Sequence, residues 1–188
     1  FNQEKRDRLR SQLGIKDELV IGHVGRFMKQ KNHDFLIDVF AAVVKEKPDA
    51  KLLLIGEGSL ENKIKAKVTR LSLENNVLFL GVRSDVADLY NVMDIFVLPS
   101  FYEGLPVVGV EAQANGLKCL FSDRVTKETK LSPSAEFLSL DELFMWVRKI
   151  QKYRYGHFDC NQRMSSKLMV RFDISKQSIS LRDLLLSY

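Results

Sequence analysis

Apolar residues along the chain fall into two kinds of segment that alternate. Short, continuous apolar runs bounded by glycine, proline or polar residues are typical of buried β-strands, whereas apolar residues three and four apart are typical of helices. The short runs predict strands over residues 18–25, 51–56, 76–81, 94–100, 118–123 and 135–140. Most of these runs are apolar at nearly every position, which favours strands that are covered on both faces.

Helical patterns lie between these strands and follow the last of them. They predict helices over residues 6–14, 33–47, 59–73, 84–93, 106–116 and 140–153, and a helical stretch from about 160 to 188. Asn32, Ser59 and Ser84 precede helical patterns and are expected to cap them. Pro106 is expected in the first turn of its helix, and Gly116 at the end of the same helix.

The alternation of strands and helices predicts an α/β fold. We expect a Rossmann-like parallel sheet of about six strands with helices on both faces. The 188 residues are enough for one domain with a full core and few for two, so a single domain over residues 1–188 is expected. Ligands of such sheets bind at the carboxyl ends of the strands, so the loops there are the candidate sites.

Composition and charge narrow the classes of function. The net charge is +5, but the basic residues are scattered, so we expect no nucleic-acid partner. The positive balance is compatible with an anionic ligand or with peripheral association with an acidic membrane surface. The two cysteines, Cys119 and Cys160, lack C-x-x-C spacing. This favours a reduced, cytoplasmic chain, with the inner face of the membrane as the alternative location.

Several familiar signatures are missing from the sequence. No apolar run approaches the length of a membrane span, and no secretory signal is visible. No G-x-G-x-x-G follows a strand and no Walker A motif occurs, which disfavours a nicotinamide or P-loop enzyme. No D-x-D occurs either, so we expect neither a metal site nor a cofactor. Because the sequence begins at Phe1 without Met, we expect it to be part of a longer protein.

The loops after the first two strands carry phosphate-binding features. In "GRFMKQKNH", Gly25 allows a tight exit from the strand, and Arg26 and Lys31 lead into a helix start. Cationic side chains beside a helix N-terminus suit a phosphate or diphosphate, and the position of the loop favours this over solvated loop charges, which are the alternative. In "GEGS", Gly56 suggests a close approach of the backbone to a ligand, and a simple turn is the alternative.

The loops after the third and fourth strands suggest contacts with a base and with hydroxyl groups. Backbone near Val82 and Arg83 could meet a planar base, although a strand-to-helix turn explains most of that sequence. In "PSFYEGLPVV", Glu103 lies in a loop just before a helix start with unpaired N–H groups. Glu111 follows inside that helix, where its apolar neighbours predict burial and therefore a need for partners. Carboxylates accept hydrogen bonds in pairs, which suits vicinal diols.

Taken together, these motifs resemble a known family. The set "VGRFMKQKNHDFLI", "LLLIGEG", "VLFLGVRSDV" and "DIFVLPSFYEGLPVVGVEAQANG" is similar to the nucleotide-sugar-binding half of retaining GT-B glycosyltransferases of the group 1 (family 4) type. The resemblance runs from about residue 15 to 123. The E-x7-E pair with the upstream Gly-Arg and Lys is specific as a set. Lys118, where many relatives have proline, and a region 123–140 without the common glycine-rich segment resemble the capsule and exopolysaccharide branch.

The resemblance implies a role for each candidate residue. Arg26, Lys31 and Glu103 are implied as the catalytic set: the two cations hold the diphosphate, and Glu103 contacts the donor sugar. Glu111 is implied to bind the ribose. The implied donor-binding residues are Gly25, Gly56, Val82, Arg83, Gly104, Leu105, Pro106, Val107 and Glu111.

The resemblance also implies a function. The chain is expected to be the C-terminal donor-binding domain of a hexosyltransferase that uses a nucleotide-diphosphate sugar, in this family a UDP-hexose, as substrate. A glycan or lipid-linked acceptor would bind through an N-terminal domain that this chain lacks, so the chain alone is expected to be inactive. The alternatives are a non-catalytic nucleotide-sugar-binding module and a GT-B sugar-nucleotide epimerase.

Overall fold

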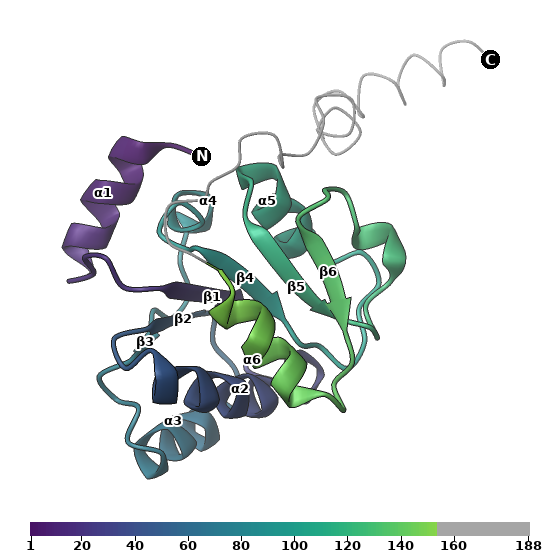
Figure 1. Ribbon diagram of the computed structural model, residues 1–188, viewed down its shortest axis with the longest axis horizontal. Helices are drawn as coiled ribbons and strands as arrows, with labels where there is room; N and C mark the ends of the chain where they lie inside the picture. Colours follow the sequence, from purple (N-terminus) through teal and green to yellow (C-terminus); the bar gives the residue numbers. More distant parts are fainter. Residues whose placement is uncertain (154–188) are drawn as a thin grey trace.

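The fold is built on one parallel sheet. The computed structural model describes residues 1–153. Its strands are β1 (Val20–Val24), β2 (Lys51–Ile55), β3 (Val77–Phe79), β4 (Ile95–Leu98), β5 (Lys118–Ser122) and β6 (Ala135–Leu138). Their order across the sheet is β3-β2-β1-β4-β5-β6, and every neighbouring pair is parallel (Figure 1). Each strand lies within its predicted range, so the predicted six-stranded parallel sheet is confirmed.

Helices cover both faces of this sheet, as predicted. They are α1 (Gln3–Gln12), α2 (His33–Glu46), α3 (Glu61–Arg70), α4 (Val86–Leu89), α5 (Val107–Asn115) and α6 (Leu143–Gln151), with 3-10 turns η1 (Lys29–Lys31) and η2 (Lys127–Thr129). Figure 1 shows α2, α3 and α6 on one side of the sheet, and α1, α4 and α5 on the other. The helix predicted from about residue 160 onward lies outside the described residues.

The apolar strand runs are explained by two cores, one on each face of the sheet. On β2, Leu52 and Leu54 pack into the core beneath α2, α3 and α6. Leu53 and Ile55 pack into the core on the opposite face. Successive side chains of a strand point to opposite faces, so a strand buried on both sides must be apolar at every position.

Of the three predicted N-caps, Asn32 is confirmed in position and the two serines are wrong. Asn32 is the N-cap residue of α2, but it has a left-handed φ of 54° and makes no side-chain bond to the helix, because it turns the chain from η1 into the helix. α3 begins at Glu61 after Leu60, and α4 begins at Val86 after Asp85. Neither of these two helices receives a side-chain cap. In α4 the carboxylate of the preceding residue is instead bonded to a neighbouring arginine in the same loop.

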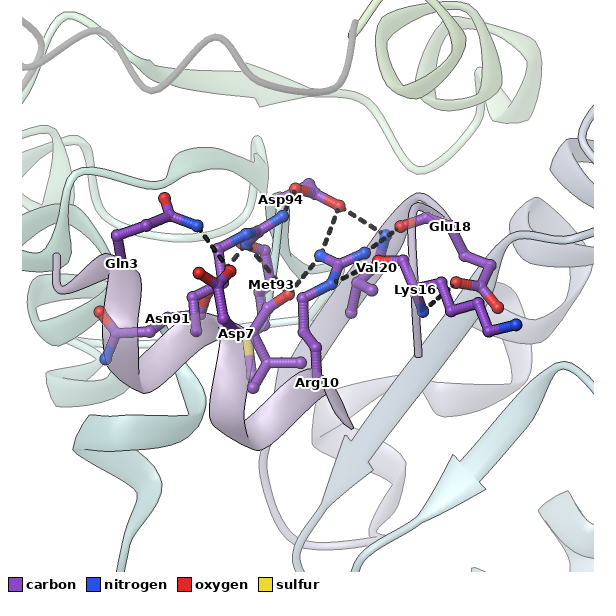
Figure 2. A network of polar contacts seen from close by, with 11 residues as sticks. Gln3, Asp7, Arg10, Lys16, Glu18, Val20, Asn91, Met93 and Asp94 are labelled. Carbon is purple, nitrogen blue, oxygen red and sulfur yellow. Dashed lines mark hydrogen bonds and ion pairs between the residues drawn. The ribbon is translucent and has the colours of Figure 1, made fainter. Parts of the chain in front are cut away.

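Buried ion pairs attach α1 to the edge of the sheet at which the strands begin. The guanidinium of Arg6 lies 2.6 Å from Oδ1 of Asp94. The guanidinium of Arg10 lies 3.5 Å from Oδ2 of the same residue (Figure 2). Oδ2 also accepts a hydrogen bond from the backbone N–H of Val20 at 2.8 Å, so one carboxylate joins α1 to the starts of β1 and β4. α1 therefore does not cover the opposite edge of the sheet, at which the strands end. Within residues 1–153, no helix has the length and apolar character needed to cross a bilayer.

Candidate functional site

The candidate site lies where the strand order reverses. β1 and β4 are neighbours, and the chain continues from β1 into α2 on one face and from β4 into α5 on the other. Because all the strands are parallel, the loops after β1 to β5 emerge at one edge, here called the carboxyl edge. Doubly wound sheets bind ligands at this edge, in the crevice at the reversal point. The loops after β1 and β4 therefore flank the expected binding position.

An ion pair joins these two loops. Nζ of Lys31 lies 2.5 Å from Oε1 of Glu103, and their side chains are only 15% and 9% exposed. The backbone of Glu103 is held as well, through a bridge to Val125 and a hydrogen bond from the N–H of Thr126 to its carbonyl at 3.4 Å. The structure thus brings together two of the three residues predicted as catalytic.

Arg26, the third residue predicted as catalytic, lies in the same loop as Lys31. Its backbone is fixed on both sides, because Gly25 N–H donates to the carbonyl of Ile55 and Phe27 N–H donates to the carbonyl of Glu57, each at 2.9 Å. The side chain of Arg26 is exposed. Within residues 1–153 its guanidinium has no hydrogen bond or ion pair, so a charge is held at the carboxyl edge without an internal partner.

The glycines after β2 make close backbone contacts with the loop after β1. Gly56 has a φ of 133°, and a Cβ there would lie 2.4 Å from the carbonyl oxygen of Gly25. A Cβ at Gly58 would lie 2.5 Å from the carbonyl oxygen of Phe27. The N–H of Gly56 also donates to the carbonyl of Gly81 at 2.8 Å. The close approach expected toward a ligand is made here to protein backbone, and a contact of Gly56 with the donor stays a prediction.

The loop after β3 exposes the two residues predicted to lie near a base. Val82 is 68% exposed. Arg83 donates two hydrogen bonds to the carboxylate of Asp85, at 2.8 and 2.7 Å. These bonds hold the pKa of Asp85 below its usual value and raise that of Arg83. The pair is therefore fully ionised at neutral pH, and Val82 offers an apolar side chain to solvent beside it.

The start of α5 is also open. Pro106 precedes the helix with a φ of −72°, so it is the N-cap residue and lies just outside the first turn in which it was predicted. No side chain caps this helix start. A Cβ on Gly104 would meet nothing within 4 Å, and Leu105 and Val107 are 44% and 65% exposed. Unpaired N–H groups in such a setting suit an anion or a hydroxyl oxygen.

Glu111 is exposed, which corrects the expectation that it is buried. Its immediate neighbours Val110 and Ala112 face the core from the other side of α5, where they are buried. It does have a partner, because the hydroxyl of Tyr90 donates to its Oε2 at 2.9 Å. Burial, followed by the charge of Glu111, raises the pKa of Tyr90, so this hydroxyl remains a donor. The carboxylate keeps further acceptor positions for ligand hydroxyls.

Two histidines beneath the Lys31 loop are buried and neutral. Nδ1 of His23 bonds the carbonyl of Val97 at 2.8 Å, and the His33 ring stacks on Phe27 with 4.2 Å between centroids. Burial is the main cause that lowers the pKa of His23 to about 4 and that of His33 to about 2. The nearby charge of Lys31 contributes to both values, and His23 contributes to that of His33. Within residues 1–153, Nε2 of His23 and both ring nitrogens of His33 lack hydrogen-bond partners. Packing, and not proton transfer, is their evident role.

The sequence did not point to Gln30 or Tyr90. The side chain of Gln30 donates to Oε2 of Glu103 at 3.3 Å, across 73 residues of sequence. Nothing in its own neighbourhood distinguishes it from the lysines on either side, and Tyr90 is one aromatic residue in a helical pattern. Within residues 1–153, no group of three or more His, Cys, Asp or Glu side chains is placed to hold a metal ion.

Comparison with known families gives a direct match. A sequence model described as "Glycosyl transferases group 1" matches residues 5–129. That range includes the loops after β1, β2, β3 and β4 and every candidate residue described above.

Known relatives agree with this match. EpsF of Bacillus subtilis (strain 168), whose name assigns it to the glycosyltransferases, is 42% identical over 154 residues, which is 80% of this chain and 40% of EpsF. The UDP-Gal:alpha-D-GlcNAc-diphosphoundecaprenol alpha-1,3-galactosyltransferase of Escherichia coli is 35% identical over 115 residues, 59% of this chain and 30% of that enzyme. The capsular polysaccharide biosynthesis glycosyltransferase CapM of Staphylococcus aureus is 39% identical over 101 residues, 53% of this chain and 27% of CapM. The chain therefore spans less than half the length of these relatives.

Solved structures support the fold. Anabaena Alr3699/HepE in complex with UDP and glucose matches with a TM-score of 0.80 at 23% identity, over 100% of this chain and 53% of HepE. The C-terminal domain of LpcC, a glycosyl transferase group 1 family protein from Francisella tularensis, matches with a TM-score of 0.67 at 19% identity, over 90% of this chain and 93% of that domain. The chain belongs to the group 1 glycosyl transferases, and its described residues form a Rossmann-like domain of the GT-B type.

Proposed function

We propose that this domain binds a nucleoside diphosphate sugar, with a UDP-hexose as donor, and serves a longer protein that transfers the sugar with retention to a glycan or lipid-linked acceptor. Family membership supports the reaction class. The name of the E. coli relative specifies UDP-Gal and a diphosphoundecaprenol-linked acceptor, and HepE structures contain UDP or UDP-glucose. Those ligands belong to the relatives, and their extension to this chain is the proposal.

The observation that carries the proposal is the pairing of Lys31 with Glu103 at the reversal point, 2.5 Å apart, with Arg26 exposed in the same loop. When the sugar leaves the diphosphate, negative charge develops on the phosphate oxygens. Two cations in one loop beside the diphosphate stabilise that charge through charge-assisted hydrogen bonds. They can do so without a divalent metal, so donor binding is proposed to be independent of metal.

The remaining residues have roles that follow from their positions. Glu103 accepts hydrogen bonds from hydroxyls of the donor sugar, and the backbone from Gly104 to Val107 contacts the sugar and the diphosphate. Glu111, oriented by Tyr90, accepts from the ribose hydroxyls. The loop at 81–86 contacts the base, with Val82 as its most exposed apolar side chain.

A ligand panel tests the proposal. The chain is titrated with UDP, ADP, GDP, their glucose conjugates and UDP-N-acetylglucosamine, and heat of binding and melting temperature are followed with and without EDTA. A ligand specific for the folded state raises the melting temperature as its concentration exceeds its dissociation constant. UDP and its sugars are expected to bind, with no change in EDTA. Binding to none of these ligands would contradict the donor-domain proposal, and loss in EDTA would contradict its metal-independent form.

Turnover assays distinguish the alternatives. An epimerase would convert a UDP-sugar without any acceptor, and a binding module would bind the donor but support no transfer in the longer protein. A transferase consumes donor only together with an acceptor.

A further inference from the structure

Gln30 forms a threefold connection between the two loops of the candidate site. Its backbone carbonyl accepts a hydrogen bond from Phe101 N–H at 2.8 Å. Its side-chain amide donates to the carbonyl of Tyr102 at 3.0 Å and to Oε2 of Glu103 at 3.3 Å. The three partners are consecutive residues of the loop after β4. No other residue of the loop after β1 is described with this many bonds to it.

The two oxygens of the Glu103 carboxylate are thereby held separately. Lys31 bonds Oε1 at 2.5 Å, and Gln30 bonds Oε2. The terminal torsion angle of a glutamate has a broad, roughly twofold distribution. A single hydrogen-bond partner therefore leaves the carboxylate free to rotate. A second donor on the other oxygen restricts that rotation. The two side chains that restrict it are neighbours in sequence, so the conformation of η1 sets both.

The chemistry of Gln30 suits this task. Both of its side-chain partners are acceptors only, so the amide nitrogen and not the amide oxygen must face them. An amide adds donors without adding charge. Glu103 is therefore oriented without a second cation competing for its negative charge, and its remaining lone pairs stay available to hydroxyl groups.

We infer that Gln30 is a positioning residue that orients the Glu103 carboxylate toward the sugar of the donor. The inference rests on the proposed function, because it takes the donor sugar as the ligand of Glu103. Gln30 acts through Glu103 and need not touch the donor itself. Its loss should therefore affect a ligand that carries a sugar and spare one that ends at the diphosphate.

The experiment compares UDP with UDP-glucose on the 188-residue chain. Gln30→Met keeps the length of the side chain and removes the amide. Gln30→Glu keeps the shape but places a carboxylate against two acceptors. Gln12→Met, on the exposed end of α1, is the matched control for the same chemical change away from the site. Dissociation constants are measured by calorimetry at one salt concentration.

We expect Gln30→Met to weaken UDP-glucose roughly three- to tenfold and UDP less than twofold, in line with the loss of about one ordinary hydrogen bond. Gln30→Glu should weaken UDP-glucose more than Gln30→Met does, and Gln12→Met should change neither constant. In a Glu103→Gln background, Gln30→Met should add little further loss, because the carboxylate that it orients is already gone.

Equal losses for UDP and UDP-glucose would show that Gln30 only maintains the loops and would overturn the inference, as would unchanged constants for both ligands. Full additivity with Glu103→Gln would overturn it as well. A wild-type chain that binds UDP and UDP-glucose equally, with both unaffected by Glu103→Gln, would contradict the sugar contact of Glu103. A wild-type chain that binds neither ligand would overturn the proposed function together with the inference.

Discussion

Lys31 and Glu103 form an ion pair between loops that follow adjacent strands, with 2.5 Å between Nζ and Oε1. The resemblance assigned the two residues to different parts of one donor, the diphosphate and the sugar. Their pairing means that the side chain proposed to offset the charge of the diphosphate also orients the carboxylate proposed to contact the sugar. Because both side chains are largely covered, removal of one leaves the other with an incompletely compensated charge.

Lys31→Ala is expected to weaken UDP binding by about 1.5–3 kcal/mol, the range for a lost hydrogen bond to a charged group, and to leave uridine binding nearly unchanged. It should also lower the melting temperature, since Glu103 loses its partner. Lys29 is an exposed residue of the same 3-10 turn, so Lys29→Ala is the control. It should change neither the affinity for UDP nor the melting temperature. Arg26→Ala should reproduce the loss of UDP binding without the loss of stability. Calorimetry with UDP and uridine, and a melting curve for each variant, check this; equal losses for both ligands would contradict the diphosphate role.

Glu111→Gln is expected to weaken binding of UDP while the fold persists. The amide oxygen can still accept the hydrogen bond from Tyr90, but the side chain loses half of its acceptor capacity toward a vicinal diol. 2′,3′-Dideoxy-UDP lacks that diol, so its affinity should be low in the wild type and change little on substitution. A parallel titration of the two nucleotides measures this difference. If both lost the same affinity, the ribose contact of Glu111 would be wrong.

Gly56→Ala is expected to destabilise the domain by about 1–3 kcal/mol, the usual cost of overpacking, and so to lower the melting temperature by several degrees. The added Cβ would lie 2.4 Å from the carbonyl of Gly25, on a residue whose φ is 133°. Gly104→Ala is the matched control, since a Cβ there meets nothing within 4 Å, and its melting temperature should not change. Thermal unfolding of both variants measures the difference. An unchanged melting temperature for Gly56→Ala would show that the backbone of the loop after β1 can shift at little cost in free energy.

Most of the fold could be predicted from the sequence, because a sheet covered on both faces leaves a strong local signal. Residues 52–55 are buried alternately in two separate cores, so every position of the run must be apolar. Such a continuous apolar run predicts a strand. The helix caps could not be predicted in the same way. Whether Ser59 or Ser84 caps a helix depends on the exact residue at which the helix begins, and in both cases it begins two residues later.

The candidate site was predicted only as far as local motifs reach. Gly-Arg, Lys31 and the E-x7-E pair are local patterns with a chemical meaning. The structure places Gly-Arg, Lys31 and Glu103 after β1 and β4 at the carboxyl edge, and Glu111 in α5, the helix that follows Glu103. The contacts of Gln30 with Glu103 and of Tyr90 with Glu111 cross 73 and 21 residues of sequence. They depend on how strands are ordered in the sheet, which periodicity does not encode. The exposure of Glu111 was misjudged because adjacent helical residues point in different directions.

His33→Phe is expected to reduce the acid sensitivity of the domain. The folded state holds His33 neutral, with a pKa of about 2, whereas the unfolded chain takes up a proton near its ordinary value of 6.5. Stability is therefore fully present above pH 6.5 and falls as the pH decreases. At pH 5, one such histidine lowers the free energy of unfolding by about 2 kcal/mol. Phenylalanine removes this loss and preserves the ring stacked on Phe27.

Urea unfolding at pH 7.5 and pH 5.0 measures that effect. The difference in unfolding free energy between the two pH values should be about 2 kcal/mol smaller in His33→Phe than in the wild type. Because neither ring nitrogen has a hydrogen-bond partner within residues 1–153, stability at pH 7.5 should not fall appreciably. An identical pH dependence in both proteins would contradict the burial of a neutral His33.

The 188-residue chain is expected to bind a UDP-sugar but not to transfer its sugar. Transfer requires an acceptor held against the anomeric carbon, and much of the reduction in barrier comes from that positioning. Water must also be kept from the donor. Within residues 1–153 the strands form one sheet, and Arg26, Tyr102 and Val107 at its carboxyl edge are exposed to solvent, so the described residues supply no second wall over the donor.

The measurement is release of UDP from UDP-glucose, UDP-galactose and UDP-N-acetylglucosamine in the presence of glycan and lipid-linked acceptors. Release should not exceed that of a Glu103→Gln control, even at donor concentrations that saturate binding. A chimera in which this chain replaces the matching 40% of EpsF restores a facing region from a relative 42% identical, and there release should depend on acceptor and on Glu103. Acceptor-dependent transfer by the chain alone would refute the requirement for a second domain, because positioning would then have to come from these 188 residues.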